Sequence, residues 1–115
     1  MTARVKATVV LAAGATLLLA AGSAQAQNVA AGRQVAVQVC QSCHGTDGIA
    51  KLPEAPHLAA QDATYLARQL KAYKSGERQN ELMTVVAQDL TEQQIADVAA
   101  YYSAIEIEVV KLPGR

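Results

Sequence analysis

The sequence is poor in the residues that usually build the core of a small protein. It contains no tryptophan and no phenylalanine, and its only aromatic side chains are four tyrosines among 115 residues. Its two cysteines allow at most one disulfide. Small domains bury a modest share of their surface and often need a disulfide, a metal or another added group to be stable. These absences predict that a covalently bound cofactor supplies part of the core.

An excess of charge of one sign is also missing. Ten basic side chains balance ten acidic ones, and no long basic run occurs. Proteins that bind nucleic acids carry a clustered basic surface, so this balance argues against a nucleic-acid partner.

The first residues have the pattern of a secretory signal. Arg4 and Lys6 precede an apolar stretch, residues 7–21, that is shorter than the roughly 20 residues needed to span a bilayer as a helix. The tripeptide Ala24-Gln25-Ala26 has the small-x-small pattern of a cleavage site. We therefore expect cleavage before Gln27.

Cleavage there divides the chain into a signal peptide, residues 1–26, and one mature domain, residues 27–115. The mature domain is mildly acidic because two basic residues leave with the signal. We expect export to the periplasm without stable membrane insertion, and an uncleaved N-terminal anchor is the alternative. In an oxidising compartment two cysteines would ordinarily suggest a disulfide.

Helical periodicity runs through the mature chain. Asn28 is a suitable N-cap for a helix over residues 29–40, with a stripe of small residues formed by Gly32, Ala36 and Val39. Such a stripe favours close packing against another helix.

A second helix is predicted between a cap at Asp62 and a stop at Gly76. Its inward face and its basic face follow at helical spacing. The inward residues are Leu66, Leu70 and Tyr73, and the basic residues are Arg68, Lys71 and Lys74. We interpret the basic face as a solvated surface rather than a docking patch.

The last helix has the strongest start signal. Thr91 and Gln94 match a capping box, and Leu90 and Ile95 can form a hydrophobic staple across it. Its expected buried face comprises Ile95, Val98, Ala99, Tyr102 and Ile105. Residues 45–61 are predicted to be a loop and residues 77–90 show little periodicity. The sequence thus predicts an all-α fold with three main helices.

The chemistry-bearing motif is Cys40-Gln41-Ser42-Cys43-His44, a CxxCH sequence. On a short helical turn, two thiols at this spacing can add to the two vinyl groups of one porphyrin edge, and the next residue places an imidazole under the iron. The sequence has no second CxxC or histidine pair, so a four-ligand zinc site cannot be assembled from cysteines and histidines alone. A thioredoxin-like redox pair would need a βαβ context that this helical chain lacks.

The motif and its surroundings resemble the class I c-type cytochromes, in particular the small bacterial cytochromes c553 and each half of the di-haem cytochromes c4. The matching segments are CQSCHGTDG, PHLAAQDATYLARQLKAYKSGERQNELM and LTEQQIADVAAYYSAI. The resemblance covers about residues 29–105. It implies a class I cytochrome c fold wrapped around one covalently attached haem c.

Site residues follow from this resemblance. Cys40 and Cys43 correspond to the thioether attachment points and His44 to the proximal iron ligand. The backbone carbonyl of Pro56 is expected to accept the Nδ1 proton of His44, and Met83 occupies the position of the axial thioether. The iron would then be saturated by His44 and Met83, which suits one-electron transfer.

Two further residues bear on the axial ligand and on the fold. With Met1 removed, Met83 is the only methionine, and we expect it in an irregular loop. His57 is the only competing ligand, but it directly follows Pro56 on the proximal side, so we interpret it as a surface histidine. Gly32 matches the family glycine at the helix crossing, with Tyr101 or Tyr102 as its partner.

The chain departs from the family at three points. Ala60 stands where relatives usually have glycine, which affects the local backbone path. Ala36 replaces an aromatic residue often found on the first helix, so that crossing should be less filled. A single CxxCH means that the chain itself cannot be a two-haem protein.

The predicted function is a periplasmic electron carrier that is not itself an enzyme. Its partners would be redox proteins that donate and accept electrons, such as a dehydrogenase or a terminal oxidase or reductase. Two alternatives stay open, a cytochrome subunit of a periplasmic dehydrogenase and a haem-based ligand sensor. The alternating segment IEIEVV, residues 105–110, runs into the C-terminal extension, residues 106–115, and predicts an extended arm, folded back on its own domain in preference to a partner.

Charge is unevenly distributed along the mature chain. Between residues 79 and 110 every charged side chain is acidic: Glu81, Asp89, Glu92, Asp97, Glu106 and Glu108. As a hypothesis, this acidic stretch steers the haem edge toward a basic partner. The alternative is that these residues only keep the protein soluble.

Overall fold

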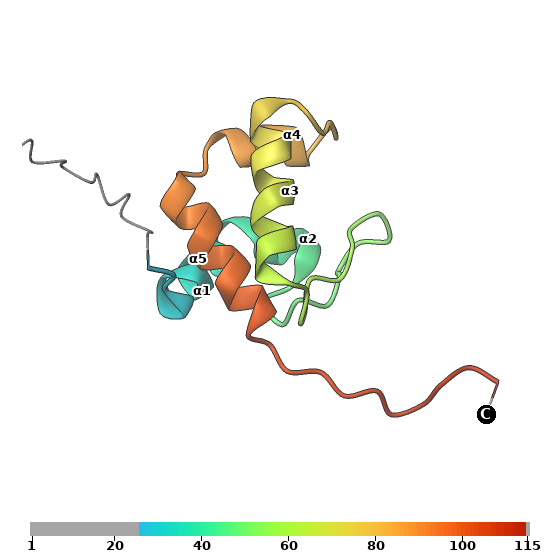
Figure 1. Cartoon of the computed structure of the whole chain (residues 1–115). Coiled ribbons are helices and arrows are strands. Elements are labelled where there is room, and N and C mark those ends of the chain that lie inside the picture. The colour runs from blue at the N-terminus through green and yellow to red at the C-terminus, as the bar shows by residue number, and fades with distance from the viewer. Residues whose placement is uncertain (1–25, 115) are drawn as a thin grey trace, which may run out of the picture.

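A computed structural model describes residues 26–114, whose helices are shown in Figure 1. The elements in chain order are α1 (Val29–Val35), the π-helical segment η1 (Ala36–Cys40), α2 (Gln41–His44), α3 (Ala63–Ser75), α4 (Met83–Gln88) and α5 (Glu92–Ser103). No strand occurs among these described residues. The expected signal peptide lies outside them apart from Ala26. In the same range, no helix is long and apolar enough to cross a bilayer.

Both ends of α3 and the start of α5 are where the sequence predicts them. The Asp62 carboxylate accepts a hydrogen bond from the Tyr65 backbone N–H at 2.7 Å, and Gly76 ends α3 in the left-handed conformation. At α5, Thr91 and Gln94 form both hydrogen bonds of the capping box. These contacts satisfy backbone groups that helix ends leave unpaired, which explains why local sequence alone located them.

The first helix starts at the expected Asn28 cap but does not continue as one α-helix to Cys40. A π-helical turn intervenes at η1, and the chain then turns once more as α2. A π turn takes up an extra residue and rotates the side chains that follow. Val39, near the end of η1, is 40% exposed rather than part of the inward stripe, whereas Val35, just before η1, is buried.

The crossing of α1 and α5 is the main helix contact, and it depends on Gly32. A Cβ at Gly32 would overlap the backbone carbonyl of Asp97 and lie 2.9 Å from Tyr101 Cβ, so Tyr101 is its aromatic partner. Asp97 is buried, and its carboxylate accepts hydrogen bonds from Asn28 N–H and Gln93 Nε2, both at 2.8 Å. This buried role removes Asp97 from the predicted acidic docking surface.

A compact cluster beside this crossing forms the hydrophobic core. Its buried members are Val35, Ala36, Leu66, Leu90, Ile95, Val98, Ala99 and Tyr102. Ile95 and Tyr102 are the largest fully buried side chains, as the last helix's periodicity predicts. Ile105 is only half-buried and lies beyond the end of α5. Ala36 is 0% exposed, so the smaller residue at this position leaves no opening to solvent.

The helix α4 was not predicted by the sequence, and Met83 lies at its first residue rather than in an irregular loop. The Asn80 side-chain oxygen accepts hydrogen bonds from the backbone N–H groups of Leu82 and Met83, each at 3.0 Å. This turn fixes the path of the chain into α4. With only six residues and Val85 65% exposed, α4 has too little apolar periodicity to be recognised.

The predicted basic face of α3 is not simply solvated. The Lys74 ammonium donates to the carbonyl of Leu90 and, at 3.3 Å, to that of Gln88. Lys71 forms an ion pair with Glu92 at 2.9 Å. These contacts join α3 to α4 and α5, so Lys71 and Lys74 are structural links between helices.

The expectation that the C-terminal arm folds back is wrong. Beyond α5 the chain extends away from the helices (Figure 1). The side chains of Ile107, Val109 and Val110 are 62%, 71% and 87% exposed. The described fold contains no strand edge with which an extended segment could pair, and α1 and α3 already pack against α5.

Candidate functional site

The CxxCH motif occupies the short turn α2 and the residue that caps it. Cys40 precedes the turn, and Cys43 and His44 lie within it. Both thiols are free and half-buried in this structure. Burial raises the pKa of the Cys40 thiol to about 11, opposed in part by a hydrogen bond with Tyr102. With its pKa raised in this way, the Cys40 thiol is neutral near neutral pH, as expected for a thiol that lines an apolar cavity.

His44 is held in one orientation by the loop that follows it. Its Nδ1 lies 2.9 Å from the carbonyl oxygen of Pro56, and only 7% of the residue is exposed. Since a carbonyl can only accept, Nδ1 carries the proton and Nε2 has a free lone pair. The predicted partnership of His44 and Pro56 is therefore present.

Two tyrosines of α5 hold the same loop from behind. The Tyr102 hydroxyl donates to the carbonyl of Gly45 at 2.9 Å, and the Tyr101 hydroxyl donates to that of Thr46 at 2.8 Å. Sequence reasoning assigned these rings to helix packing and missed their hydroxyls. No local pattern could have found them, because donor and acceptor are more than fifty residues apart in the chain.

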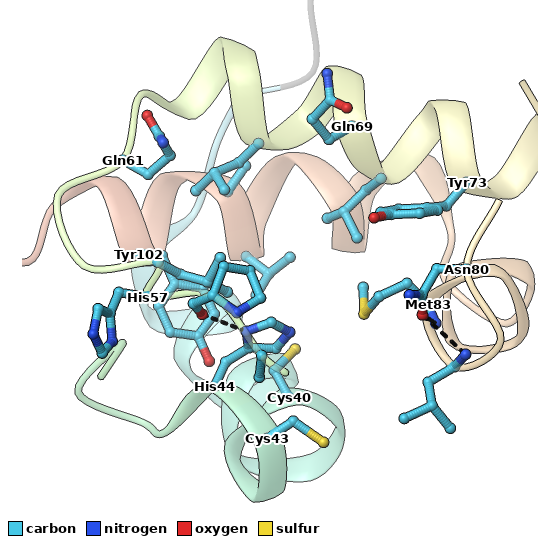
Figure 2. A pocket seen from close by; sticks show the side chains of 18 of the residues that line it. Cys40, Cys43, His44, His57, Gln61, Gln69, Tyr73, Asn80, Met83 and Tyr102 are labelled. Carbon is cyan, nitrogen blue, oxygen red and sulfur yellow. Dashed lines mark hydrogen bonds between the residues drawn. The ribbon is translucent and has the colours of Figure 1, made fainter. Parts of the chain in front are cut away.

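Met83 faces His44 across the cavity. Figure 2 shows the Met83 thioether on one side and the His44 imidazole on the other, with Cys40 and Cys43 below them. Met83 is half-buried and comes from the start of α4, after the turn made by Asn80. The structure thus brings the two predicted axial ligands to opposite sides of one space.

That space is a cavity of about 620 Å³, which all five predicted site residues line. They are Cys40, Cys43, His44, Pro56 and Met83. Apolar side chains from α3, α5 and the loop before α3 form much of the remaining wall: Leu58, Leu66, Leu70, Val98 and Ala99. A flat, largely apolar group attached at the two thiols fits this donor set and these walls.

His57 lies away from the axial position, as predicted. It is exposed, its Nδ1 accepts a hydrogen bond from the Ala50 N–H at 2.8 Å, and it stands on the same side of the cavity as His44 (Figure 2). The His57 side chain therefore lies on the opposite side of the cavity from Met83.

The sequence model of the cytochrome c family, described as "Cytochrome c", matches residues 29–105. The chain belongs to the cytochrome c family. Cytochromes c carry a covalently bound haem c with iron and transfer electrons, so this chain is a haem-containing electron-transfer protein rather than an enzyme.

Individual relatives agree with this assignment. The chain is 48% identical over 73 residues to cytochrome c-554(548) of Halomonas halodenitrificans, a match that covers 61% of this chain and 88% of that protein. It is 35% identical over 109 residues to a thiosulfate dehydrogenase electron acceptor of Stutzerimonas stutzeri, covering 90% of this chain and 50% of that protein.

A solved structure confirms the fold class. Cytochrome c4 of Acidithiobacillus ferrooxidans superposes with a TM-score of 0.64 and 32% identity, over 72% of this chain and 54% of the other. The fold is therefore the all-α class I cytochrome c fold. The chain spans about half the length of this cytochrome c4.

The cavity of this cytochrome c also has a polar wall that sequence reasoning missed. Gln61, Gln69, Tyr73 and Arg78 line it, and the first three are seen along the α3 side in Figure 2. Only the periodicity of α3 signalled any of them, through Tyr73. Arg78 lies beyond the helix end, where the sequence shows no regular pattern.

Proposed function

We propose that this cytochrome c is a periplasmic one-electron carrier whose haem is attached through Cys40 and Cys43. In this proposal His44 supplies the proximal nitrogen through Nε2, and Met83 supplies the axial thioether from the opposite side. The observation that carries the proposal is the placement of His44 and Met83 on facing walls of one cavity, with both thiols on the same side of it.

The residues around His44 determine how it would act as a ligand. The hydrogen bond from Nδ1 to the Pro56 carbonyl fixes the tautomer, orients the ring and strengthens Nε2 as an electron donor. Mutation of an outer partner of this kind typically lowers metal affinity or activity by about 10–100-fold. Tyr102 supports the arrangement by holding the Gly45 carbonyl next to His44.

The haem supplies a reversible ferric–ferrous couple when it is bound. With the His44 imidazole and the Met83 thioether as ligands, the iron would have no open position for substrate, and the thioether would raise the potential by favouring the ferrous state. The protein's contribution is to fix both ligands before each transfer and to keep water from the apolar walls. A ligand-sensing role would require an open sixth position, against which the location of Met83 argues.

Attachment is tested by expressing the full chain in a host with c-type maturation machinery. The wild-type protein should keep its haem on a denaturing gel and show a weak sulfur-to-iron band in the far red when ferric. Cys40→Ala and Cys43→Ala should sharply reduce the yield of haem-containing protein. A matched control is Ser42→Ala within the same motif, because Ser42 is exposed and its hydroxyl approaches the Cys43 thiol only at 3.8 Å.

Cellular location is tested independently of haem binding. N-terminal sequencing of the mature protein should begin at Gln27, and the protein should appear in the periplasmic fraction. A mature chain that retains residues 7–21 would instead support the membrane-anchor alternative.

A second candidate function is the cytochrome subunit of a dehydrogenase complex. The exposed apolar arm supports it, because Ile107, Val109 and Val110 find no cover within the described chain. The similarity to a thiosulfate dehydrogenase electron acceptor supports it as well. Gel filtration of the native protein separates the two functions, since a free carrier elutes as a small monomer and a subunit elutes with its catalytic partner.

A further inference from the structure

Asp97 is a buried carboxylate without a cationic partner among the described residues. Only 5% of the residue is exposed. The Asn28 N–H and Gln93 Nε2 each donate to its Oδ1 at 2.8 Å, which leaves Oδ2 without a hydrogen bond from the described residues. Both ion pairs of the described chain involve other carboxylates. A buried charge is costly unless it is paired, so the location of Asp97 calls for a nearby cation.

The segment before Asn28 runs past this carboxylate. Gln93 Nε2 also donates to the Ala26 carbonyl at 3.0 Å, so this segment lies along α5 beside Asp97. Backbone bond lengths keep successive nitrogens less than about 4 Å apart, which puts the Gln27 nitrogen within about 7 Å of Asp97 Oδ1. In the uncleaved chain that nitrogen belongs to a neutral peptide group.

Cleavage before Gln27 would change the charge at this point. It would remove the Ala26 carbonyl and turn the Gln27 nitrogen into an α-amino group, which is largely protonated at neutral pH because its ordinary pKa is about 7.7–8.0. Gln93 would keep its bond to Asp97 and hold that carboxylate near the new terminus. Asn28 caps α1 with its side chain, so the terminus follows a fixed residue and loses little freedom on pairing.

We propose that the α-ammonium group created by cleavage before Gln27 pairs with Asp97 and thereby completes the crossing of α1 and α5. The proposal rests on the cleavage included in the proposed function. Gly32 of α1 already lies against the backbone of Asp97, so the ion pair adds to an existing contact between the two helices (Figure 1). The precursor lacks this cation, and removal of the signal peptide would therefore stabilise the fold only after export.

The other charged groups on the two helices are exposed. Arg33 is the charged residue of α1, and Glu92 of α5 pairs with Lys71. A nearby carboxylate raises the pKa of an amine because it favours the charged form. The ion pair would therefore contribute stability that is fully present below the unfolded pKa of the α-amino group. That contribution is lost as the pH rises through the higher folded value.

The test compares two forms of the holoprotein. One has a free Gln27 amine. The other is treated with glutaminyl cyclase, which joins the α-nitrogen to the side-chain Cδ, releases ammonia and leaves a neutral lactam. At about pH 6.5 the cyclised form should unfold at a temperature lower by roughly 4–8 °C. The difference should disappear as the pH rises above the pKa of the amine, whereas a purely steric effect of the lactam ring would persist at every pH.

Two variants identify the carboxylate. D97N removes the charge but keeps an oxygen that can accept from the Asn28 N–H, and E92Q removes an exposed carboxylate from the same helix. The difference between the free and cyclised forms should vanish in D97N and persist in E92Q. Should D97N fail to fold, the pH comparison in the wild type decides.

A wild-type difference that is absent or constant with pH overturns the proposal, and so does an equal difference in D97N. Mass spectrometry of the mature chain checks the terminus separately. A terminus other than Gln27 would contradict the cleavage site and the ion pair with it. The haem spectrum is independent of both, so a failure here is distinguishable from a failure of haem attachment.

Discussion

Nδ1 of His44 and the carbonyl oxygen of Pro56 are 2.9 Å apart, although twelve residues separate them in the chain. The loop between them is held in place by hydrogen bonds from both sides. Leu58 N–H donates to the Gly48 carbonyl at 2.8 Å, and Tyr102 donates to that of Gly45. The orientation of the proposed iron ligand is thus a property of the whole loop and of α5.

Replacing Met83 with alanine should leave the haem attached and open the sixth iron position. The ferric far-red band should disappear, the reduction potential should fall, and carbon monoxide should bind the ferrous protein readily. The reason is that His57, the other candidate, lies on the His44 side of the cavity. Val85→Ala is a matched control, because Val85 is on the same helix and is 65% exposed. An unchanged six-coordinate spectrum for Met83→Ala would show that another residue is the ligand.

Ala60→Gly should stabilise the protein. Ala60 has a backbone φ of 59°, in the left-handed region where a Cβ is unfavourable. Relief of this strain is worth about 1 kcal/mol after the flexibility of glycine in the unfolded chain is included. Thermal unfolding of the holoprotein should shift upward by roughly 4–8 °C. The neighbouring Ala59→Gly should be destabilising, since Ala59 has no positive φ; equal shifts for both would contradict the explanation.

Gly32→Ala should weaken the crossing of α1 and α5. The new Cβ would overlap the Asp97 backbone carbonyl, which cannot move as a flexible side chain can. Overpacking of this kind costs about 1–3 kcal/mol, which denaturant unfolding of the holoprotein would measure. Gly76→Ala is the comparison variant. Gly76 has a φ of 81° and no atom within 4 Å of where a Cβ would lie, so this variant measures the cost of backbone strain without a steric clash. A smaller loss for Gly32→Ala than for Gly76→Ala would argue against close helix contact.

The structure reduces the number of acidic residues that could steer a redox partner. Asp97 is buried and Glu92 pairs with Lys71, which leaves four exposed acidic residues: Glu81 and Asp89 beside α4, and Glu106 and Glu108 on the C-terminal extension. If they steer a basic partner, electron-transfer rates should fall as added salt shortens the Debye length below roughly 10 Å. Glu81→Lys and Asp89→Lys should slow the reaction at low salt. Rates that ignore both variants would leave solubility as the role of these charges.

The stability of the loop after the CxxCH motif should depend on Asp47 at acid pH. The Ile49 backbone N–H and the Lys51 ammonium hydrogen-bond to its carboxylate and lower its pKa below the ordinary value of 3.8. A lowered pKa contributes stability that is fully present above the unfolded value and is lost as the pH falls through the folded one. Asp47→Asn should therefore be less stable than the wild type near neutral pH. The difference should shrink below about pH 4, as measured by thermal unfolding across pH.

The sequence located what depends on neighbouring residues. The capping box of Thr91 and Gln94, the Asp62 cap and the Gly76 stop are contacts within a few residues, so their patterns are complete in the local chain. The CxxCH motif is local for the same reason. The resemblance to the cytochromes c added Pro56 and Met83 to the predicted site. No local sequence pattern relates either residue to His44.

Tertiary structure decided the features that depend on distant contacts. Val39, in the π-helical turn η1, is exposed although the sequence pattern placed it inward. The short helix α4 begins at Met83 and is tied to α3 by the hydrogen bond from Gln88 Nε2 to the Lys74 carbonyl, a contact that its own periodicity does not indicate. The extended arm stays apart from the domain because the described helices offer it no strand edge.

The composition of this chain determined by itself that its core needed a further apolar group, and one short motif identified that group as a haem. Only the folded chain decided which side chains meet around it. Arg78, just beyond the end of α3, lines the cavity because Gln69 and Tyr73 on that helix hold its guanidinium there. Tyr102 reached the loop beside His44 because α5 crosses behind it. A sequence pattern records spacing along the chain, whereas these contacts depend on how helices pack in space.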